Sequence, residues 1–229
     1  MGRAPQVAPD AGGAESAPSR REYRSPLREQ RAAQTRMALL VAARRLFTTS
    51  GWTGTGMRDI AVEAGVATET VYAYFPSKRA LFQAVVDVAV VGDDQPIALA
   101  ERAEFAAMGR GTRHDRITAA SRILTGVHVR TAAFARVLRE AANSDQEIAV
   151  MLEATRKRQR RDVSAAVELV VGGEVGEADC DGVWALTSPE VYLLLVESSG
   201  WAADQYEAWM TEMLERAVPR SPKEGMACR

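Results

Sequence analysis

The segment from Gly51 to Lys78 constrains the fold of this chain more than any other part. It reads GWTGTGMRDIAVEAGVATETVYAYFPSK, a pattern that predicts two short helices joined by a tight turn, then a Pro-Ser start of another helix. Gly65 falls between the two helices, where a residue with positive φ turns the chain without steric cost. Six apolar positions are spaced to share one small core: Ile60, Ala61, Ala64, Val66, Val71 and Phe75. The segment therefore predicts a helix-turn-helix.

The second short helix leaves most of its polar and aromatic side chains free to point outward, namely Thr68, Glu69, Thr70, Tyr72 and Tyr74. A helix-turn-helix places such a helix in the DNA major groove and reads base edges with its N-terminal residues. Glu69 can accept a hydrogen bond from a cytosine amine. Equally, it can serve only to favour the helix N-terminus. The pattern indicates a DNA reader.

This segment closely resembles the DNA-binding domain of the tetracycline-repressor (TetR) family of bacterial transcription regulators, over about residues 31–86. The most specific pieces, in order, are Ile60-Ala61, Ala64-Gly65-Val66, Thr70-Val71-Tyr72-Ala73-Tyr74-Phe75 and Ser77-Lys78. The chain departs from the family at three positions. Gly56 replaces a second Thr, Ala67 replaces a common Ser, and Glu69 replaces a small residue. The Gly56 backbone amide can still serve the phosphate that a Thr hydroxyl would bind.

The resemblance implies a DNA-binding surface with both base and phosphate contacts. The first residues of the second short helix are expected near base edges, the two tyrosines and Lys78 on phosphates, and Arg58 on either. Lys78 lies in the first turn of a helix, where the helix dipole disfavours a cation unless a phosphate binds there. The expected DNA contacts are Thr55, Gly56, Arg58, Thr68, Glu69, Thr70, Tyr72, Tyr74 and Lys78.

The charge distribution along the 229 residues agrees with a DNA-binding segment in the N-terminal third of the chain. The whole chain has a net charge of −1, but residues 1–82 carry 12 Lys and Arg against 7 Asp and Glu. The remainder carries 17 against 23, which makes it acidic. A basic N-terminal third joined to an acidic remainder fits one part that contacts DNA and another with a different task.

Helical periodicity extends over the whole chain after residue 25, and strand signals are weak. Helices are expected over about 26–49, in the two short segments, from Ser77 to about Val91, and near 97–108, 114–143, 145–171, 179–197 and 203–217. Pro189 should kink or restart the helix that contains it. The Ser77 side chain can cap the helix that begins there, and Asp145 or Ser144 can cap the helix over 145–171. The predicted fold is all-α. It comprises a disordered arm (1–25), a three-helix DNA-binding domain (26–82), a larger helical domain (83–218) and a flexible tail (219–229).

The arm and the larger domain each allow two interpretations. The basic end of the arm is either a solvated tail or a DNA-contacting extension. The resemblance implies that the larger domain forms a homodimer and often encloses a small-molecule site. His128 is either a hydrogen-bonded core residue or a ligand contact. The expected pocket residues are Val127, His128, Thr131, Phe134, Trp184 and Tyr192.

Nothing in the sequence indicates catalysis, a metal site or a cofactor. His114 and His128 are the two histidines, and neither has metal-ligand spacing with another suitable residue. No glycine-rich phosphate loop follows a strand, and no serine lies in a nucleophile elbow. Two distant cysteines, the absence of a signal-peptide pattern and the absence of a long apolar run predict a cytoplasmic protein.

The sequence as a whole predicts a homodimeric transcription regulator. We expect a repressor that binds a palindromic operator in double-stranded DNA and is released by a small-molecule effector. Two alternatives stay open. One is a dimeric DNA-binding protein without an effector. The other is a metabolite-binding protein or enzyme that contains a helix-turn-helix-like segment. The operator, the effector and the sign of regulation do not follow from the residues.

Overall fold

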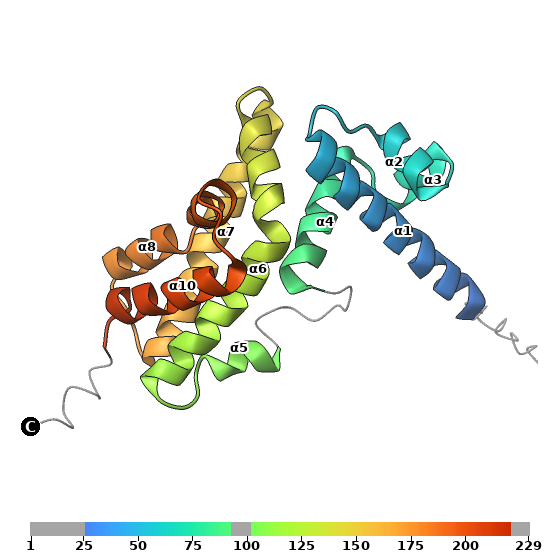
Figure 1. The fold of residues 1–229 in the computed structure, drawn as a ribbon. Coiled ribbons are helices and arrows are strands. Elements are labelled where there is room, and N and C mark those ends of the chain that lie inside the picture. Colours follow the sequence, from blue (N-terminus) through green and yellow to red (C-terminus); the bar gives the residue numbers. More distant parts are fainter. Residues whose placement is uncertain (1–25, 93–101, 221–229) are drawn as a thin grey trace, which may run out of the picture. The chain divides into compact units, whose positions relative to one another are not determined.

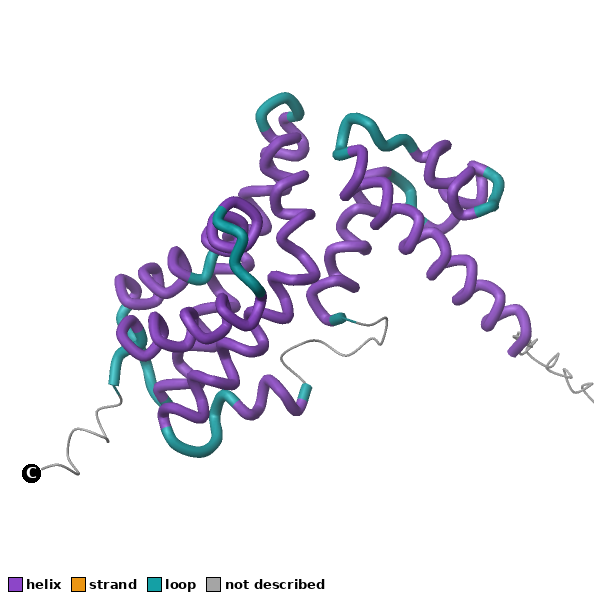
Figure 2. Tube along the Cα trace, in the orientation of Figure 1, coloured by secondary structure: helices purple, strands orange, loops and turns teal. Residues whose placement is uncertain are grey.

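The computed structural model describes residues 26–92 and 102–220, and these residues form helices joined by loops (Figures 1 and 2). No strand occurs in the described part of the chain, which confirms the all-α prediction. The predicted arm over residues 1–25 lies outside the described residues. None of the described helices is long and apolar enough to cross a membrane.

The N-terminal helices follow the sequence prediction closely. They are α1 (Pro26–Ser50), α2 (Met57–Ala64), α3 (Thr68–Tyr74) and α4 (Lys78–Val91). Gly51 ends α1 with a φ of 69°, and Gly92 ends α4 with a φ of 96°. From Arg36 onward the chain belongs to one compact unit.

The larger domain consists of α5 (Ala103–Ala107), α6 (Arg113–Ala142), α7 (Gln146–Val171), α8 (Glu177–Leu186), α9 (Pro189–Tyr192), the π-helix η2 (Leu193–Ser198) and α10 (Ala203–Ala217). The helix expected near 179–197 is restarted at its proline, as predicted: Pro189 begins α9 at its first position and separates it from α8. This is the restart that proline favours, since its missing N–H costs nothing in a first turn. Of the predicted helix near 97–108, the described part is α5; of the predicted tail, Pro219 and Arg220 are described and follow α10.

Side chains cap several helices at positions that local sequence chemistry predicts. Ser77 Oγ accepts a hydrogen bond from the Ala80 amide at 3.1 Å, and Asp145 Oδ1 accepts from Glu147 and Ile148 at the start of α7. Thr112 and Asp115 form a reciprocal capping box at the start of α6. These caps satisfy amides that a helix leaves without partners, and each contributes about 1 kcal/mol.

The buried apolar residues form two clusters. The first joins the N-terminal helices to the end of α6 and the start of α7, through Phe134, Val137, Leu138, Ala141 and Ile148. The second lies among the helices of the larger domain and includes Ile117, Tyr192, Tyr206, Met210 and Leu214. The α6 helix contributes to both clusters and is the longest described helix (Figure 1). A shift of α6 in one cluster would therefore also move the α6 side chains that pack in the other cluster.

Candidate nucleic-acid interface

The turn between α2 and α3 is set by Gly65. Its φ is 69°, in the left-handed region that favours glycine, and its amide donates to the Val62 carbonyl at 3.2 Å. The next amide, at Val66, donates to the Ala61 carbonyl at 3.0 Å. This pair of bonds closes α2 and redirects the chain into α3 within three residues.

One buried residue anchors α3 to the domain. Val71 is fully buried, and Phe75 directly after the helix is also buried. The opposite side of the helix is open to solvent. Glu69 and Tyr72 are exposed, Tyr72 with 52% of its surface accessible, while Thr68, Thr70 and Tyr74 are half-buried. The predicted base-reading residues therefore share an accessible helix of the kind that enters a major groove.

The loop before α2 places its two predicted DNA contacts differently from the expectation. Thr55 is buried, and its hydroxyl donates to the Gly51 carbonyl at 2.8 Å. The Gly56 amide donates to Asp59 Oδ2 at 2.8 Å. Both groups thus hold the loop and the start of α2 together in the unbound protein. Arg58, two residues further on, is exposed on α2 and stays accessible to a phosphate.

Lys78 has an internal partner at the start of α4. Its ammonium group donates to the Trp52 carbonyl and lies 4.2 Å from the centroid of the Trp52 ring. Burial lowers the pKa of the Lys78 ammonium, while the nearby carboxylates of Asp145 and Asp59 act in the opposite direction. The predicted phosphate ligand is therefore held over an aromatic face rather than extended into solvent.

Trp52 also connects this corner to the larger domain. Its indole N–H donates to Asp145 Oδ2 at 3.2 Å, and Asp145 is the residue that caps α7. One residue after Lys78, Arg79 pairs with Glu147 of the same α7 turn at 2.9 Å. Two polar contacts thus join the start of α4 and the loop before α2 to the first turn of α7.

The residues predicted to line a pocket do not form one group. His128 and Tyr192 are both buried, and their ring centroids lie 5.4 Å apart. The Thr131 hydroxyl donates to the Val127 carbonyl at 2.8 Å, within α6. Phe134 belongs to the first apolar cluster, where its ring contacts Phe82. Val127 and Trp184 are half-buried on α6 and α8.

Sequence reasoning missed the residues that hold this interface in place. Trp52 and Asp145 are 93 positions apart, so no local pattern links them. The hydroxyl of Tyr206 lies 3.0 Å from His128 Nδ1, and these two residues are 78 positions apart, so no local pattern links them either. The one local signal was the capping position of Asp145, which marked it as fixed in place.

Comparison with known proteins agrees with this geometry. Residues 39–85 match the family described as bacterial regulatory proteins, tetR family. Among solved structures, a Rhodococcus sp. protein assigned to the TetR family of transcriptional regulators is 15% identical, with a TM-score of 0.62 over 82% of this chain and 100% of that one. A TetR family member from Streptomyces coelicolor A3 is 18% identical, with a TM-score of 0.55 over 81% and 98%. The flavonoid-responsive regulator FrrA is 24% identical, with a TM-score of 0.50 over 81% and 96%.

No curated protein sequence matches the chain significantly. The fold and the exposed α3 define a class, the all-α proteins that join a helix-turn-helix DNA-binding domain to a larger helical domain. Residues 39–85 thus carry the segment by which tetR-family bacterial regulatory proteins are defined, and the chain as a whole has the fold of solved TetR-family transcriptional regulators.

Proposed function

We propose that the chain is a homodimeric cytoplasmic repressor. It binds a palindromic operator in double-stranded DNA and is released from it by a small-molecule effector. The observation that supports this most directly is α3, which rests on buried Val71 while Thr68, Glu69, Thr70 and Tyr72 remain at least partly accessible. In this proposal α3 enters the major groove, Arg58 and Tyr74 fix its register on the phosphates, and Lys78 exchanges the Trp52 carbonyl for a phosphate when DNA binds. Thr55 is left out of the contact set because its hydroxyl is buried.

Dimerisation is supported by apolar side chains that the larger domain leaves exposed. Val129, Val150 and Leu194 are each more than half exposed, and apolar side chains that a second copy covers are removed from water. A second copy that covers part of this surface would bring two α3 helices to one DNA. Two identical domains related by a two-fold axis read an inverted repeat.

Release by an effector requires that the larger domain influence the position of the N-terminal helices. The contacts Trp52–Asp145 and Arg79–Glu147, with the Phe82–Phe134 ring pair at 5.9 Å, provide the physical connection. An effector that prefers a conformation in which the two α3 helices are spaced wrongly for DNA would lower operator affinity. The reduction in operator affinity cannot exceed the ratio of the effector's affinities for the two conformations.

Lys78 provides a first prediction. Lys78→Ala should weaken binding to all DNA sequences and reduce the slope of log affinity against log salt by roughly one phosphate contact. Fluorescence anisotropy with a labelled duplex across a salt series measures both. Arg158→Ala, which removes an exposed arginine of α7, is the matched control and should change neither quantity. Equal slopes for Lys78→Ala and the parent protein would remove Lys78 from the phosphate contacts.

The proposed function as a whole is tested by selecting DNA from a random pool with the purified protein. Enrichment of an inverted repeat, together with a dimer mass by light scattering, is the expected result. Recovery of no sequence motif, with only weak and steeply salt-dependent binding, would contradict the operator proposal. The protein would then bind DNA only through its basic surface, without a sequence preference.

A further inference from the structure

One face of α6 carries polar side chains where a core helix normally carries apolar ones. Thr118, Ser121, Thr125 and His128 follow one another at steps of three or four residues, so they share one face of the helix. Ser121 is fully buried, Thr125 is 4% exposed and His128 is 3% exposed. We name Thr118, Ser121 and Thr125 the hydroxyl row.

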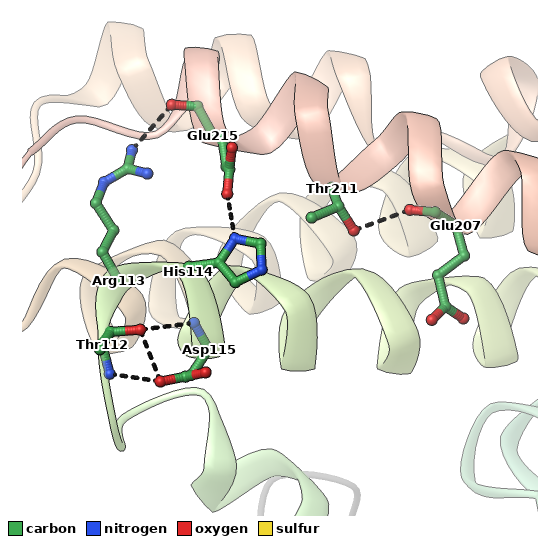
Figure 3. Close-up of polar contacts among 7 residues, drawn as sticks. All are labelled: Thr112, Arg113, His114, Asp115, Glu207, Thr211 and Glu215. Atoms are coloured by element: carbon green, nitrogen blue, oxygen red, sulfur yellow. Dashed lines mark hydrogen bonds and ion pairs between the residues drawn. The ribbon is translucent and has the colours of Figure 1, made fainter.

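The hydroxyl row lies on the side of α6 that faces α10. His114 Nδ1 contacts Glu215 Oε1 at 2.5 Å before the row begins, and His128 contacts the Tyr206 hydroxyl after it ends. Figure 3 shows the first of these contacts, with α10 alongside the start of α6. Because both flanking histidines reach α10, the face between them is directed toward α10 as well.

The three hydroxyls of the row have no hydrogen-bond partner. The oxygen atoms of Thr118, Ser121 and Thr125 are all buried and unbonded. Between Tyr206 and Glu215, α10 contributes the buried apolar side chains of Met210 and Leu214. Thr211 offers no free hydroxyl hydrogen, since it donates to the Glu207 carbonyl at 2.9 Å (Figure 3). Buried polar groups are normally paired, and leaving them unpaired opposes folding.

An aromatic group lies at the end of the row. His128 packs against Tyr192 and Tyr206, whose own ring centroids are 4.9 Å apart in an edge-to-face arrangement. Burial lowers the pKa of His128 to about 4 and raises the pKa of Tyr206, so both groups are uncharged at neutral pH. The face therefore combines unbonded hydroxyl groups with uncharged aromatic rings.

We infer that the hydroxyl row and the adjoining aromatic group form the effector site, and that the effector is an uncharged aromatic molecule with hydroxyl or carbonyl substituents. The substituents bond the row, and the rings of Tyr192 and Tyr206 pack against the aromatic part. A charged ligand is disfavoured because the charged groups of α10 beside the face already have partners, Glu207 with Arg122 and Glu215 with His114. This inference rests on the proposed function and gives its effector a chemical class.

The first test asks whether the hydroxyls are unpaired in the ligand-free protein. Thr125→Val keeps the shape of the side chain and removes the unbonded hydroxyl, so it should raise the Tm by roughly 2–4 °C. Thr131→Val is the matched control on the same helix. Its hydroxyl already bonds the Val127 carbonyl, so this variant should not raise the Tm. A lower Tm for Thr125→Val than for the parent protein would show that the hydroxyl is already bonded and would overturn the inference.

The second test measures binding with probes of one size. Saturation-transfer NMR at millimolar concentration compares uncharged para-hydroxyacetophenone with anionic para-hydroxybenzoate and apolar para-ethyltoluene. We expect the uncharged polar probe to bind best, and the double variant Ser121→Ala, Thr125→Val to bind it about tenfold more weakly. Failure of para-hydroxyacetophenone to bind, or equal binding by the double variant, would overturn the inference.

Selection of DNA from a random pool shows whether a negative result contradicts the effector class or the proposed function itself. If the unmodified protein binds an inverted repeat but not para-hydroxyacetophenone, the effector class is wrong and the regulator remains. If it binds no specific DNA, the proposed function fails whatever the probe does.

Discussion

Phe82→Ala should lower the free energy of unfolding by about 3–5 kcal/mol, the cost of removing a large ring from a packed core. Phe82 is fully buried. Its ring contacts Phe47 at 4.9 Å, Trp52 at 5.6 Å and Phe134 at 5.9 Å between centroids, each nearly edge-to-face. Since these partners come from α1, the following loop and α6, one cavity would loosen both the DNA-binding helices and their junction with the larger domain. Urea denaturation monitored by circular dichroism measures the loss.

Tyr72→Ala is the matched control for this prediction. It removes an aromatic ring of similar size from the same part of the chain, but Tyr72 is 52% exposed on α3. A substitution at such a surface position should change the free energy of unfolding by about 0.5 kcal/mol or less. Comparable losses for the two variants would contradict a packed junction around Phe82.

The second large effect is a loss of stability at mildly acidic pH. Burial, partly opposed by a hydrogen bond with the Thr187 backbone, lowers the pKa of His128 from 6.5 to about 4 in the folded protein. The unfolded chain therefore binds a proton at a higher pH than the folded one. The stability associated with neutral His128 is present above pH 6.5 and is lost as the pH falls toward 4. From pH 7 to pH 5 this loss should be about 2 kcal/mol.

Urea denaturation at the two pH values measures that loss, and variants at the two histidines assign it. In His128→Gln the loss in free energy of unfolding between pH 7 and pH 5 should disappear, because the group that titrates is gone. His114→Gln removes the other histidine, which is exposed at the start of α6, and should retain the loss. If His128→Gln lost as much stability at pH 5 as the parent protein does, His128 would not be the buried titrating group.

The sequence predicted the features that depend on neighbouring residues. Gly65 turns the chain because its φ is positive, Ser77 and Asp145 cap helices through their own side chains, and Pro189 restarts a helix because it lacks an N–H. Each of these effects acts within about one helical turn. For that reason the bounds of α1 through α4 and the order of the later helices could be read from the residues.

Contacts between distant residues could not be predicted in the same way. Lys78 was assigned to phosphate from its place at a helix start, but its neighbour Trp52 came into contact only through the packing of α1 and α4. Phe134 and His128 are six residues apart on α6, and the sequence placed them in one pocket. Phe134 contacts Phe82 of α4 and belongs to the first cluster, whereas His128 contacts Tyr192 of α9 and Tyr206 of α10, which belong to the second.

The way in which α3 is anchored allows DNA preference and folding to change independently. The helix is held by Val71 and by the following Phe75, whereas Glu69 and Tyr72 contribute little buried surface. Substitutions at the exposed positions can alter which base edges are recognised without a large cost in stability. Mutation can therefore change DNA preference, in evolution or in the laboratory, while the scaffold is kept.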